Sequence, residues 1–243
     1  MRLNGRVAVI TGGAGGIGSA TASRLATEGA SVVVADVDLS AAERVAAELG
    51  GRAVQVDVTA VESIRKMVQQ VGPIDVLVNN AGWDRVQRFV DTDEVFWDKV
   101  LAINLRGQIA CAHAVLPGMI ERKQGRIICV ASDAGRVGSS GEVVYSAAKG
   151  GVIAFSKALA REVARFGICV NAVAPGPADT PFLKIFSEDP SNERIVEAMV
   201  RATPLRRLAQ PVDVAGVIAF LASDDAAFMT GQTVSVSGGL TML

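Results

Sequence analysis

The sequence is poor in the residues that bind metals or form disulfides. Its 243 residues include one histidine, His113, and three cysteines, Cys111, Cys129 and Cys169. The cysteines are odd in number, and their spacing resembles neither a metal site nor a redox pair. Because a zinc site has almost no ligands to use, we expect no metal. We expect the cysteines to be small buried apolar side chains in a reducing compartment.

The sequence also lacks a surplus of charge and a long hydrophobic run. Its 24 basic and 25 acidic residues nearly cancel, so nothing favours binding to nucleic acid. No apolar stretch reaches the roughly 18 residues that a membrane span needs. The longest candidate, residues 109–120, is interrupted by His113 and Pro117. A strand-like run begins close to Met1, which leaves no room for a signal peptide. We therefore expect a cytoplasmic protein with no nucleic-acid or membrane partner.

Short β-branched runs alternate with longer alanine-rich segments of helical period along the chain. Most of these runs are apolar throughout, which is typical of parallel strands covered by helices on both faces. The sequence thus predicts an α/β fold: a single doubly wound Rossmann-type domain over residues 1–243, with a seven-stranded parallel sheet. The predicted strands are residues 7–11, 31–36, 53–56, 74–79, 126–131, 168–174 and 233–236.

Two long helical segments and one interruption of the alternation stand out. We expect helices at residues 95–122, with a bend near Asn104, and at residues 143–166. Residues 180–203 break the rhythm between the last two strands and contain two prolines and several charges. An insertion at the carboxyl end of a strand lies over the ligand crevice of such a sheet. We interpret this segment as a substrate lid, with a passive surface excursion as the alternative.

A glycine-rich segment connects the first strand to the helix that follows. It has the sequence Thr11-Gly12-Gly13-Ala14-Gly15-Gly16-Ile17-Gly18. Glycines let the backbone turn sharply and approach a pyrophosphate, while the helix N-terminus presents free N–H groups and the positive end of its dipole. The segment therefore predicts a dinucleotide site that includes Gly12, Gly16, Ile17 and Gly18.

An acidic residue ends the second strand. Asp36 follows Gly18 by 18 residues, close to where a carboxylate binds the adenosine ribose hydroxyls and repels a 2′-phosphate. No arginine or lysine lies in the glycine loop or just after Asp36. Both observations favour NAD over NADP.

The next two strands end in residues suited to the same cofactor. Asp57 and Val58 follow the third strand, where we expect the adenine edge. Asn80, Ala81 and Gly82 follow the fourth, and their small size would let the backbone close over the cofactor.

The only tyrosine of the chain lies four residues before a lysine. Tyr145 and Lys149 fall at the start of a predicted helix, where residues four apart share a face. A nearby ammonium and a positive nicotinamide ring should lower the pKa of Tyr145 toward working pH. Ser132, just past the fifth strand, could donate a hydrogen bond to a substrate oxygen. A bend at Asn104 could open a backbone carbonyl to water.

Taken together, these motifs resemble those of the short-chain dehydrogenase/reductase family, and the resemblance covers essentially the whole chain. The matching positions, in the family's order, are Thr11-Gly12-x-x-x-Gly16-x-Gly18, Asn79-Asn80-Ala81-Gly82, Asn104, Ser132, Tyr145-x-x-x-Lys149 and Pro175-Gly176 with Thr180.

The resemblance implies a role for each of these positions. Tyr145 would be the acid/base, Ser132 would position the substrate oxygen, and Lys149 would hold the nicotinamide ribose and lower the Tyr145 pKa. Asn104 would anchor a water through which the proton reaches solvent. The cofactor would also contact Tyr145 itself, and its nicotinamide would be held by Pro175, Gly176 and Thr180.

The loops after the fourth, fifth and sixth strands are the expected substrate region. Trp83 and Phe182 could form an apolar wall or pack within their loops. Arg136 and Glu142 could orient a substrate or pair with each other, and Asp133 is a further candidate.

The same loops, with residues 235–242, resemble dehydrogenases of aromatic and alicyclic acid degradation within this family. That resemblance implies reversible, NAD-dependent oxidation of a secondary alcohol to a ketone in a cyclic 2-hydroxyacyl-CoA, such as 2-hydroxycyclohexanecarboxyl-CoA. Family members commonly form tetramers, so it also implies a homotetramer built through the two long helices and the last strand.

Three alternatives remain open. The first is a 3-oxoacyl-thioester (acyl carrier protein) reductase, against which the sequence Trp83-Asp84-Arg85-Val86 and Asp36 both count. The second is a dehydrogenase of small cyclic or aryl alcohols. The third, of another class, is a catalytically silent NAD-binding scaffold, since a fold does not fix a function.

Overall fold

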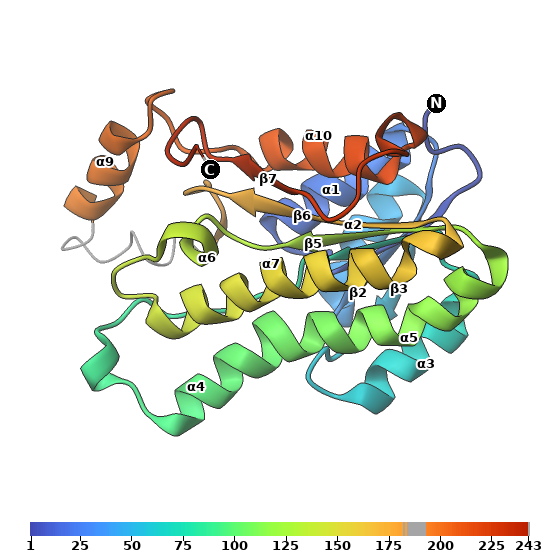
Figure 1. The fold of residues 1–243 in the computed structure, drawn as a ribbon, viewed down its shortest axis with the longest axis horizontal. Coiled ribbons are helices and arrows are strands. Elements are labelled where there is room, and N and C mark those ends of the chain that lie inside the picture. The colour runs from blue at the N-terminus through green and yellow to red at the C-terminus, as the bar shows by residue number, and fades with distance from the viewer. Residues whose placement is uncertain (182, 184–192, 243) are drawn as a thin grey trace.

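Seven parallel strands form the central sheet of the computed structural model, which describes residues 1–181, 183 and 193–242 (Figure 1). The order across the sheet is β3-β2-β1-β4-β5-β6-β7. The first three strands are therefore added toward one edge, and from β4 onward the strands are added toward the other edge. The predicted fold is confirmed, and the predicted strand ends lie within two residues of those observed. The strands are β1 (Val7–Thr11), β2 (Ser31–Asp36), β3 (Arg52–Gln55), β4 (Val76–Asn79), β5 (Gly125–Val130), β6 (Ile168–Pro175) and β7 (Thr233–Val236).

Helices cover both faces of this sheet (Figure 1). One layer consists of α1 (Gly16–Thr27), α2 (Leu39–Leu49) and α10 (Pro211–Ala222). The other consists of α3 (Val61–Val71), α5 (Gly107–Arg122) and α7 (Val143–Val163). The remaining helical segments are η1 (Phe89–Asp91), α4 (Glu94–Leu101), η2 (Ala102–Arg106), α6 (Ala134–Val137), η3 (Ala164–Phe166), α9 (Glu193–Ala202) and η5 (Asp224–Ala226).

The apolar strands contribute to two cores at once. Successive side chains of a strand point to opposite faces of the sheet. In β1, Ala8 and Ile10 lie in the core beneath α1 and α10, whereas Val9 lies in the core beneath α5 and α7. A strand in this position needs apolar residues at every site, and this is why the runs in the sequence do not alternate.

The first long helical segment is interrupted where a bend was predicted. A turn of π-helix, η2, separates α4 from α5 and contains Asn104. The whole stretch Glu94–Arg122 is long and apolar enough, by length and composition, to cross a membrane, a longer run than the sequence predicted. In this fold α5 packs Cys111, Val115 and Met119 into the core against the sheet.

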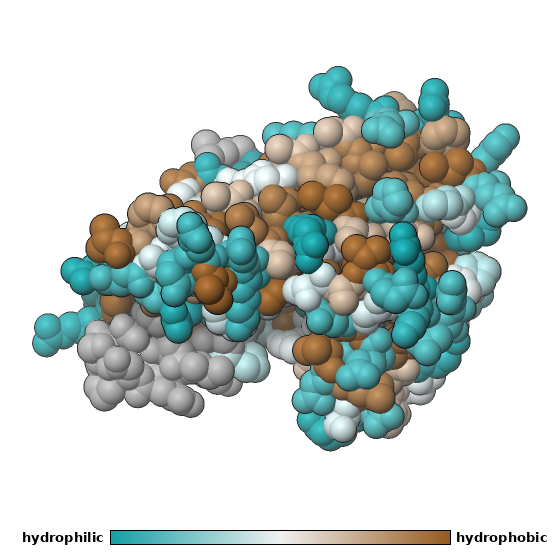
Figure 2. All heavy atoms as spheres, turned by 90° about the horizontal axis from the view of Figure 1, so that it is seen from below, coloured by the Kyte–Doolittle hydropathy of each residue, from teal (hydrophilic) through white to brown (hydrophobic). Residues whose placement is uncertain are grey.

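The outer side of this helical layer carries exposed apolar residues. Figure 2 shows the molecule from below the view of Figure 1, where apolar side chains lie in a broad band among charged ones. Exposed apolar residues of this layer include Val95 and Leu101 on α4 and Ile109 on α5.

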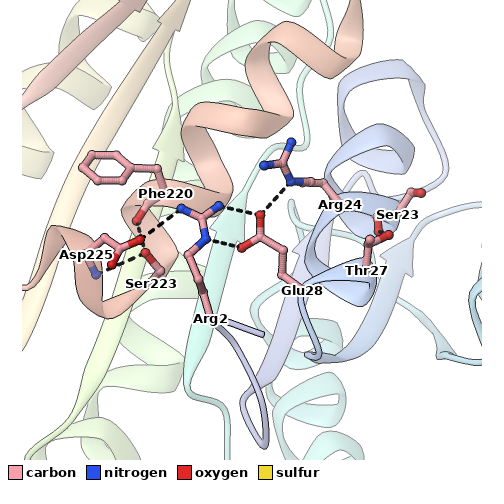
Figure 3. Close-up of polar contacts among 8 residues, drawn as sticks. All are labelled: Arg2, Ser23, Arg24, Thr27, Glu28, Phe220, Ser223 and Asp225. Atoms are coloured by element: carbon pink, nitrogen blue, oxygen red, sulfur yellow. Dashed lines mark hydrogen bonds and ion pairs between the residues drawn. The ribbon is translucent and has the colours of Figure 1, made fainter.

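Ion pairs tie the N-terminus to the edge of the sheet where the strands begin. Arg2 donates to Glu28 at 2.7 Å through Nε and to Asp225 at 3.2 Å through Nη1, and Arg24 also donates to Glu28 at 2.7 Å (Figure 3). The two arginines hold the pKa of Glu28 below its usual value. Exposed pairs of this kind contribute up to about 1 kcal/mol each, so they fasten the N-terminal segment without shaping the site at the opposite edge.

Candidate active site

A pocket of about 1440 Å³ opens at the carboxyl ends of the strands. Its position where the strand order reverses is where ligands bind in open parallel sheets, and it exceeds the ~300–1,000 Å³ of an ordinary small-ligand site. It therefore has room for a dinucleotide together with a substrate. The predicted site residues that line it are Gly12, Gly16, Ile17, Asp36, Asp57, Val58, Asn80, Ala81, Gly82, Trp83, Ser132, Asp133, Glu142, Tyr145, Lys149, Pro175, Gly176 and Thr180.

Three of the predicted residues that the structure describes are not among those that line the pocket. Gly18 and Asn104 lie behind the pocket wall, where they hold lining residues in place. Arg136 does not line the pocket and donates to Ser235 Oγ at 2.6 Å. Phe182 lies outside the described residues.

The glycine loop fits closely against the turn after β4. Gly12 has a φ of +62°, and a Cβ there would come within 2.8 Å of the Ala81 Cα. A Cβ on Gly18 would lie 2.1 Å from the Gly12 carbonyl oxygen. Asn80 Nδ2 fastens the loop by donating to the carbonyls of Thr11 at 3.1 Å and Gly12 at 2.9 Å. Side chains larger than hydrogen are thus excluded from the cradle, as a site for a pyrophosphate requires.

The first turn of α1 faces this cradle. The helix begins at Gly16, and its N-cap, Gly15, has no side chain to accept the first N–H groups. A Cβ on Gly16 would lie 3.1 Å from the Thr180 side chain, so the segment after β6 closes over the same turn. Free N–H groups at the positive end of a helix dipole fit a phosphate.

Two carboxylates lie at the far end of the pocket. Asp36 accepts hydrogen bonds from the backbone N–H groups of Ala14 at 3.0 Å and Asp38 at 3.2 Å. Asp57 accepts from the N–H and the hydroxyl of Thr59 at 2.8 and 2.7 Å. The described lining residues include no arginine, and their two lysines, Lys99 and Lys149, belong to the other end. This end therefore suits ribose hydroxyls and repels an additional phosphate.

Lys149 is fixed by a buried network. It is 2% exposed, and its Nζ donates to the Val130 carbonyl at 2.8 Å. Gln108 Nε2 donates to the same carbonyl at 3.1 Å, and Asn79 Nδ2 donates to the Gln108 carbonyl at 3.1 Å. Burial lowers the pKa of Lys149 to about 8. Residues from β4, β5, α5 and α7 thus hold one ammonium at the pocket wall.

Tyr145 lies one helical turn before this ammonium, which is 5.4 Å from its ring centre. Burial raises the pKa of the Tyr145 phenol, and the carboxyl groups of Glu142 and Asp84 raise it further. The Ser132 hydroxyl acts in the opposite direction. The lowered pKa expected from the sequence is therefore not produced by the residues of the chain themselves, because burial, and after it the two carboxyl groups, disfavour the phenolate.

Asn104 joins the π-turn to the loop after β4. It is buried, its Oδ1 accepts from the Trp83 N–H at 3.2 Å, and its Nδ2 donates to the carbonyls of Trp83 at 2.6 Å and Val100 at 2.9 Å. A Cβ on Gly82 would lie 3.0 Å from Asn104 Oδ1 and 3.7 Å from Lys149 Nζ. The bare backbone of Gly82 thus lets Asn104 and Lys149 approach the same place.

A second polar group links the loop after β5 to β7. Ser235 Oγ donates to Asp133 Oδ1 at 2.8 Å and accepts from Arg136. Asp133 is buried, and its N–H donates to the Pro175 carbonyl at 3.0 Å. Through its contact with Ser235, Arg136 steadies the segment that carries Ser132.

Two buried polar residues of the site were missed from the sequence. Gln108 supports the carbonyl that holds Lys149, and Asp84 lines the pocket beside Glu142. A glutamine within an apolar helix was a weak signal for the first. Nothing in the sequence showed that the second lies buried.

Comparison with known proteins agrees with this geometry. A family model described as "Enoyl-(Acyl carrier protein) reductase" matches residues 12–241. The 3-oxoacyl-[acyl-carrier-protein] reductase FabG of Vibrio cholerae is 39% identical over 249 residues, covering 100% of both chains. Subunit BbsD of the (2S)-[(R)-hydroxy(phenyl)methyl]succinyl-CoA dehydrogenase of Thauera aromatica is 39% identical over 251 residues, covering 100% of this chain and 99% of that one.

A solved structure is similar over the same extent. It is named as ribose-5-phosphate isomerase from Brucella melitensis 16M, and it aligns with a TM-score of 0.92 and 36% identity over 98% of this chain and 93% of its own. With a family model and full-length relatives in agreement, this chain belongs to the short-chain dehydrogenase/reductase family, whose members use a nicotinamide cofactor and act on CH–OH groups.

Proposed function

We propose that this enzyme oxidises the secondary alcohol of a cyclic 2-hydroxyacyl-CoA, such as 2-hydroxycyclohexanecarboxyl-CoA, to the ketone with NAD. The observation that carries the reaction is the meeting of Tyr145, Lys149 and Ser132 in one pocket with the glycine cradle. A thioester substrate is supported by the similarity to relatives named for acyl-carrier-protein and acyl-CoA substrates.

In this proposal the residues of the chain position the alcohol and move one proton. Bound NAD supplies the acceptor for the hydride that leaves the alcohol carbon. Ser132 donates a hydrogen bond to the substrate oxygen, and the phenolic oxygen of Tyr145 takes the hydroxyl proton. Lys149, held by the Val130 carbonyl, provides the positive charge that favours the phenolate. Asn104 anchors the route by which the proton reaches solvent.

The preference for NAD rests on Asp36. Its carboxylate is fixed by two backbone N–H groups at the far end of the pocket, and no arginine is among the described lining residues. A 2′-phosphate would meet an anion there with no compensating cation.

The substrate end is suited to an apolar ring. Trp83 lines it with its ring packed edge-on to Phe96, the centroids 5.9 Å apart. On the other side, Leu183, Ile195 and Met199 line the pocket from residues 180–203. We infer that this segment is the substrate lid and that Trp83 forms the opposite wall. The contribution predicted for Phe182 lies outside the described residues.

A second candidate, reduction of a 3-oxoacyl-acyl carrier protein, is favoured by one finding. Relatives with that name are as similar to this chain as BbsD is. The two functions differ in the shape of the acyl group, cyclic or linear.

We further propose that the enzyme is a cytoplasmic homotetramer. The exposed apolar side chains of the helical layer that includes α4 and α5 support assembly, because contiguous apolar surface is costly to leave in water.

The test is formation of NADH or NADPH from cyclic 2-hydroxyacyl-CoA and from linear 3-hydroxyacyl-CoA, each assayed with NAD and with NADP. We expect a higher kcat/KM for the cyclic substrate with NAD. A preference for the linear thioester and NADP would favour the second candidate.

Tyr145→Phe should reduce kcat by roughly 10²–10⁴ while calorimetry still detects NAD binding. A wild type that binds NAD and oxidises none of these alcohols would point to the scaffold alternative.

A further inference from the structure

Asp84 is a buried carboxyl group in the loop after β4. It is 6% exposed, and neither of its carboxyl oxygens accepts a hydrogen bond of normal geometry from a described residue. It follows the turn after β4, two residues beyond Gly82, and it lines the main pocket. Burying a carboxylate without a partner is costly, so a group kept in this position calls for a ligand.

A second carboxyl group lies beside it on a different segment. Glu142 immediately precedes α7, and both acids line the main pocket and also a second, smaller cavity. Each raises the pKa of Tyr145, which places both near the proposed reaction centre. Glu142 also raises the pKa of Asp84, which burial has already shifted from 3.8 to about 6.

The charged groups that face this pair do not neutralise it. The Arg85 guanidinium lies 5.5 Å from the centre of the Phe96 ring, and the Lys99 ammonium lies 3.7 Å from that of Trp83. The backbone N–H of Arg85 and, less strongly, its charge lower the pKa of Asp84, but burial outweighs both. The Ser139 hydroxyl likewise lowers the pKa of Glu142. Lys149, which also lines the pocket, donates through its Nζ to the Val130 carbonyl.

Two adjacent carboxyl groups in a poorly solvated place hold a proton between them more readily than either would alone. Such a pair can donate a hydrogen bond to a carbonyl oxygen, and it repels a carboxylate. A 2-hydroxyacyl thioester presents such a carbonyl, in a 1,3 relation to the alcohol carbon at Tyr145.

We propose that Asp84 and Glu142 hold one proton between them and that the protonated carboxyl group donates a hydrogen bond to the carbonyl oxygen of the substrate's thioester, so that the pocket accepts neutral thioesters and rejects the corresponding free acids. The proposal rests on the proposed function, because it assigns the second carbonyl of that substrate. It makes the two acids specificity-determining residues, separate from the group that moves the alcohol proton.

The test compares the N-acetylcysteamine thioester of 2-hydroxycyclohexanecarboxylic acid with the free acid, which removes the phosphates of CoA from the comparison. We expect the wild type to prefer the thioester strongly in kcat/KM. Asp84→Asn and Glu142→Gln remove negative charge but keep a donor, so each should reduce that preference by about tenfold or more, mainly through KM for the free acid. Asp98→Asn makes the same change at an exposed position on α4 and should leave the preference unchanged.

The pH dependence of KM gives a second readout. In the wild type, KM for the thioester should rise as the pH increases through about 6, because the shared proton is lost. In Asp84→Asn that rise should disappear, since the amide keeps its donor. A wild type with equal kcat/KM for both compounds would overturn the inference and leave the proposed function standing. Variants that keep the wild-type preference and pH profile would do the same. A wild type that oxidises neither cyclic compound would refute the proposed function. The ratio of kcat/KM for 3-hydroxybutyryl thioester to kcat/KM for 3-hydroxybutyrate, compared between the wild type and the two variants, would then decide the inference.

Discussion

At the scale of single residues, Asp84 shows how a site can cost stability. Its pKa is raised from 3.8 to about 6 because burial disfavours the charged form. The folded state therefore holds the proton more tightly than the unfolded chain does. Stability from this group is present below about pH 4, is lost as the pH rises through about 6, and stays lost above it.

We therefore predict that Asp84→Asn stabilises the protein at neutral and alkaline pH. The gain should be on the order of 1–3 kcal/mol near pH 8, because an uncharged amide escapes the penalty that the carboxylate carries there. Near pH 4 the variant and the wild type should differ little. Urea unfolding at both pH values measures the difference, and equal stability at pH 8 would show that the carboxylate is solvated or paired.

Residues of this kind mark the limit of prediction from the sequence. Gly12, Asp36 and Tyr145 could be identified because their spacing reflects a requirement of the chain itself: a tight turn, a strand end or one helical turn. Asp84 lies in a loop whose polarity looked ordinary. That its carboxyl is buried follows from the packing of this loop, through Trp83, against Phe96 of α4, which no local pattern records.

At the scale of elements, the π-turn η2 is where the helical layer connects with the site. A turn of π-helix lies at Asn104, where the sequence predicts a bend. The Asn104 amide binds both backbone groups of Trp83 and so fixes the loop that carries the pocket wall. One side chain thus couples the α4–α5 junction to the segment after β4.

We predict that Asn104→Ala loosens this junction. Three hydrogen bonds are lost, and the partly buried N–H and carbonyl of Trp83 lose their partner, so the free energy of unfolding should fall by about 2–4 kcal/mol. The thermal unfolding midpoint and kcat should both decrease. Among the described residues the Ser146 hydroxyl accepts one hydrogen bond, from the Ser139 N–H, so Ser146→Ala serves as a milder comparison. If Asn104→Ala unfolded like the wild type, the coupling assigned to its amide would be wrong.

At the scale of the whole molecule, the layered fold was predictable and its outer surface was not. Strands that are apolar at every position require a core on each face, so the sequence predicts a parallel sheet between two helical layers. The side of α5 that faces the sheet and the side that faces outward are both apolar in part, with Met119 buried and Ile109 exposed. Periodicity alone does not separate a core from an interface between subunits.

The exposed side of this layer supports a prediction about assembly. If α4 and α5 meet a second copy, Ile109→Glu places a charge in an apolar contact and should shift the tetramer to smaller species. Val61, at the first position of α3, is also exposed, and an acidic residue is tolerated at a helix N-terminus, so Val61→Glu is the matched control. Size-exclusion chromatography with light scattering should give a tetramer for the wild type and for Val61→Glu. A monomeric wild type would rule out the assembly. A buried unpaired charge costs on the order of 3–5 kcal/mol, so an Ile109→Glu variant that is still tetrameric would show that the interface lies on another face.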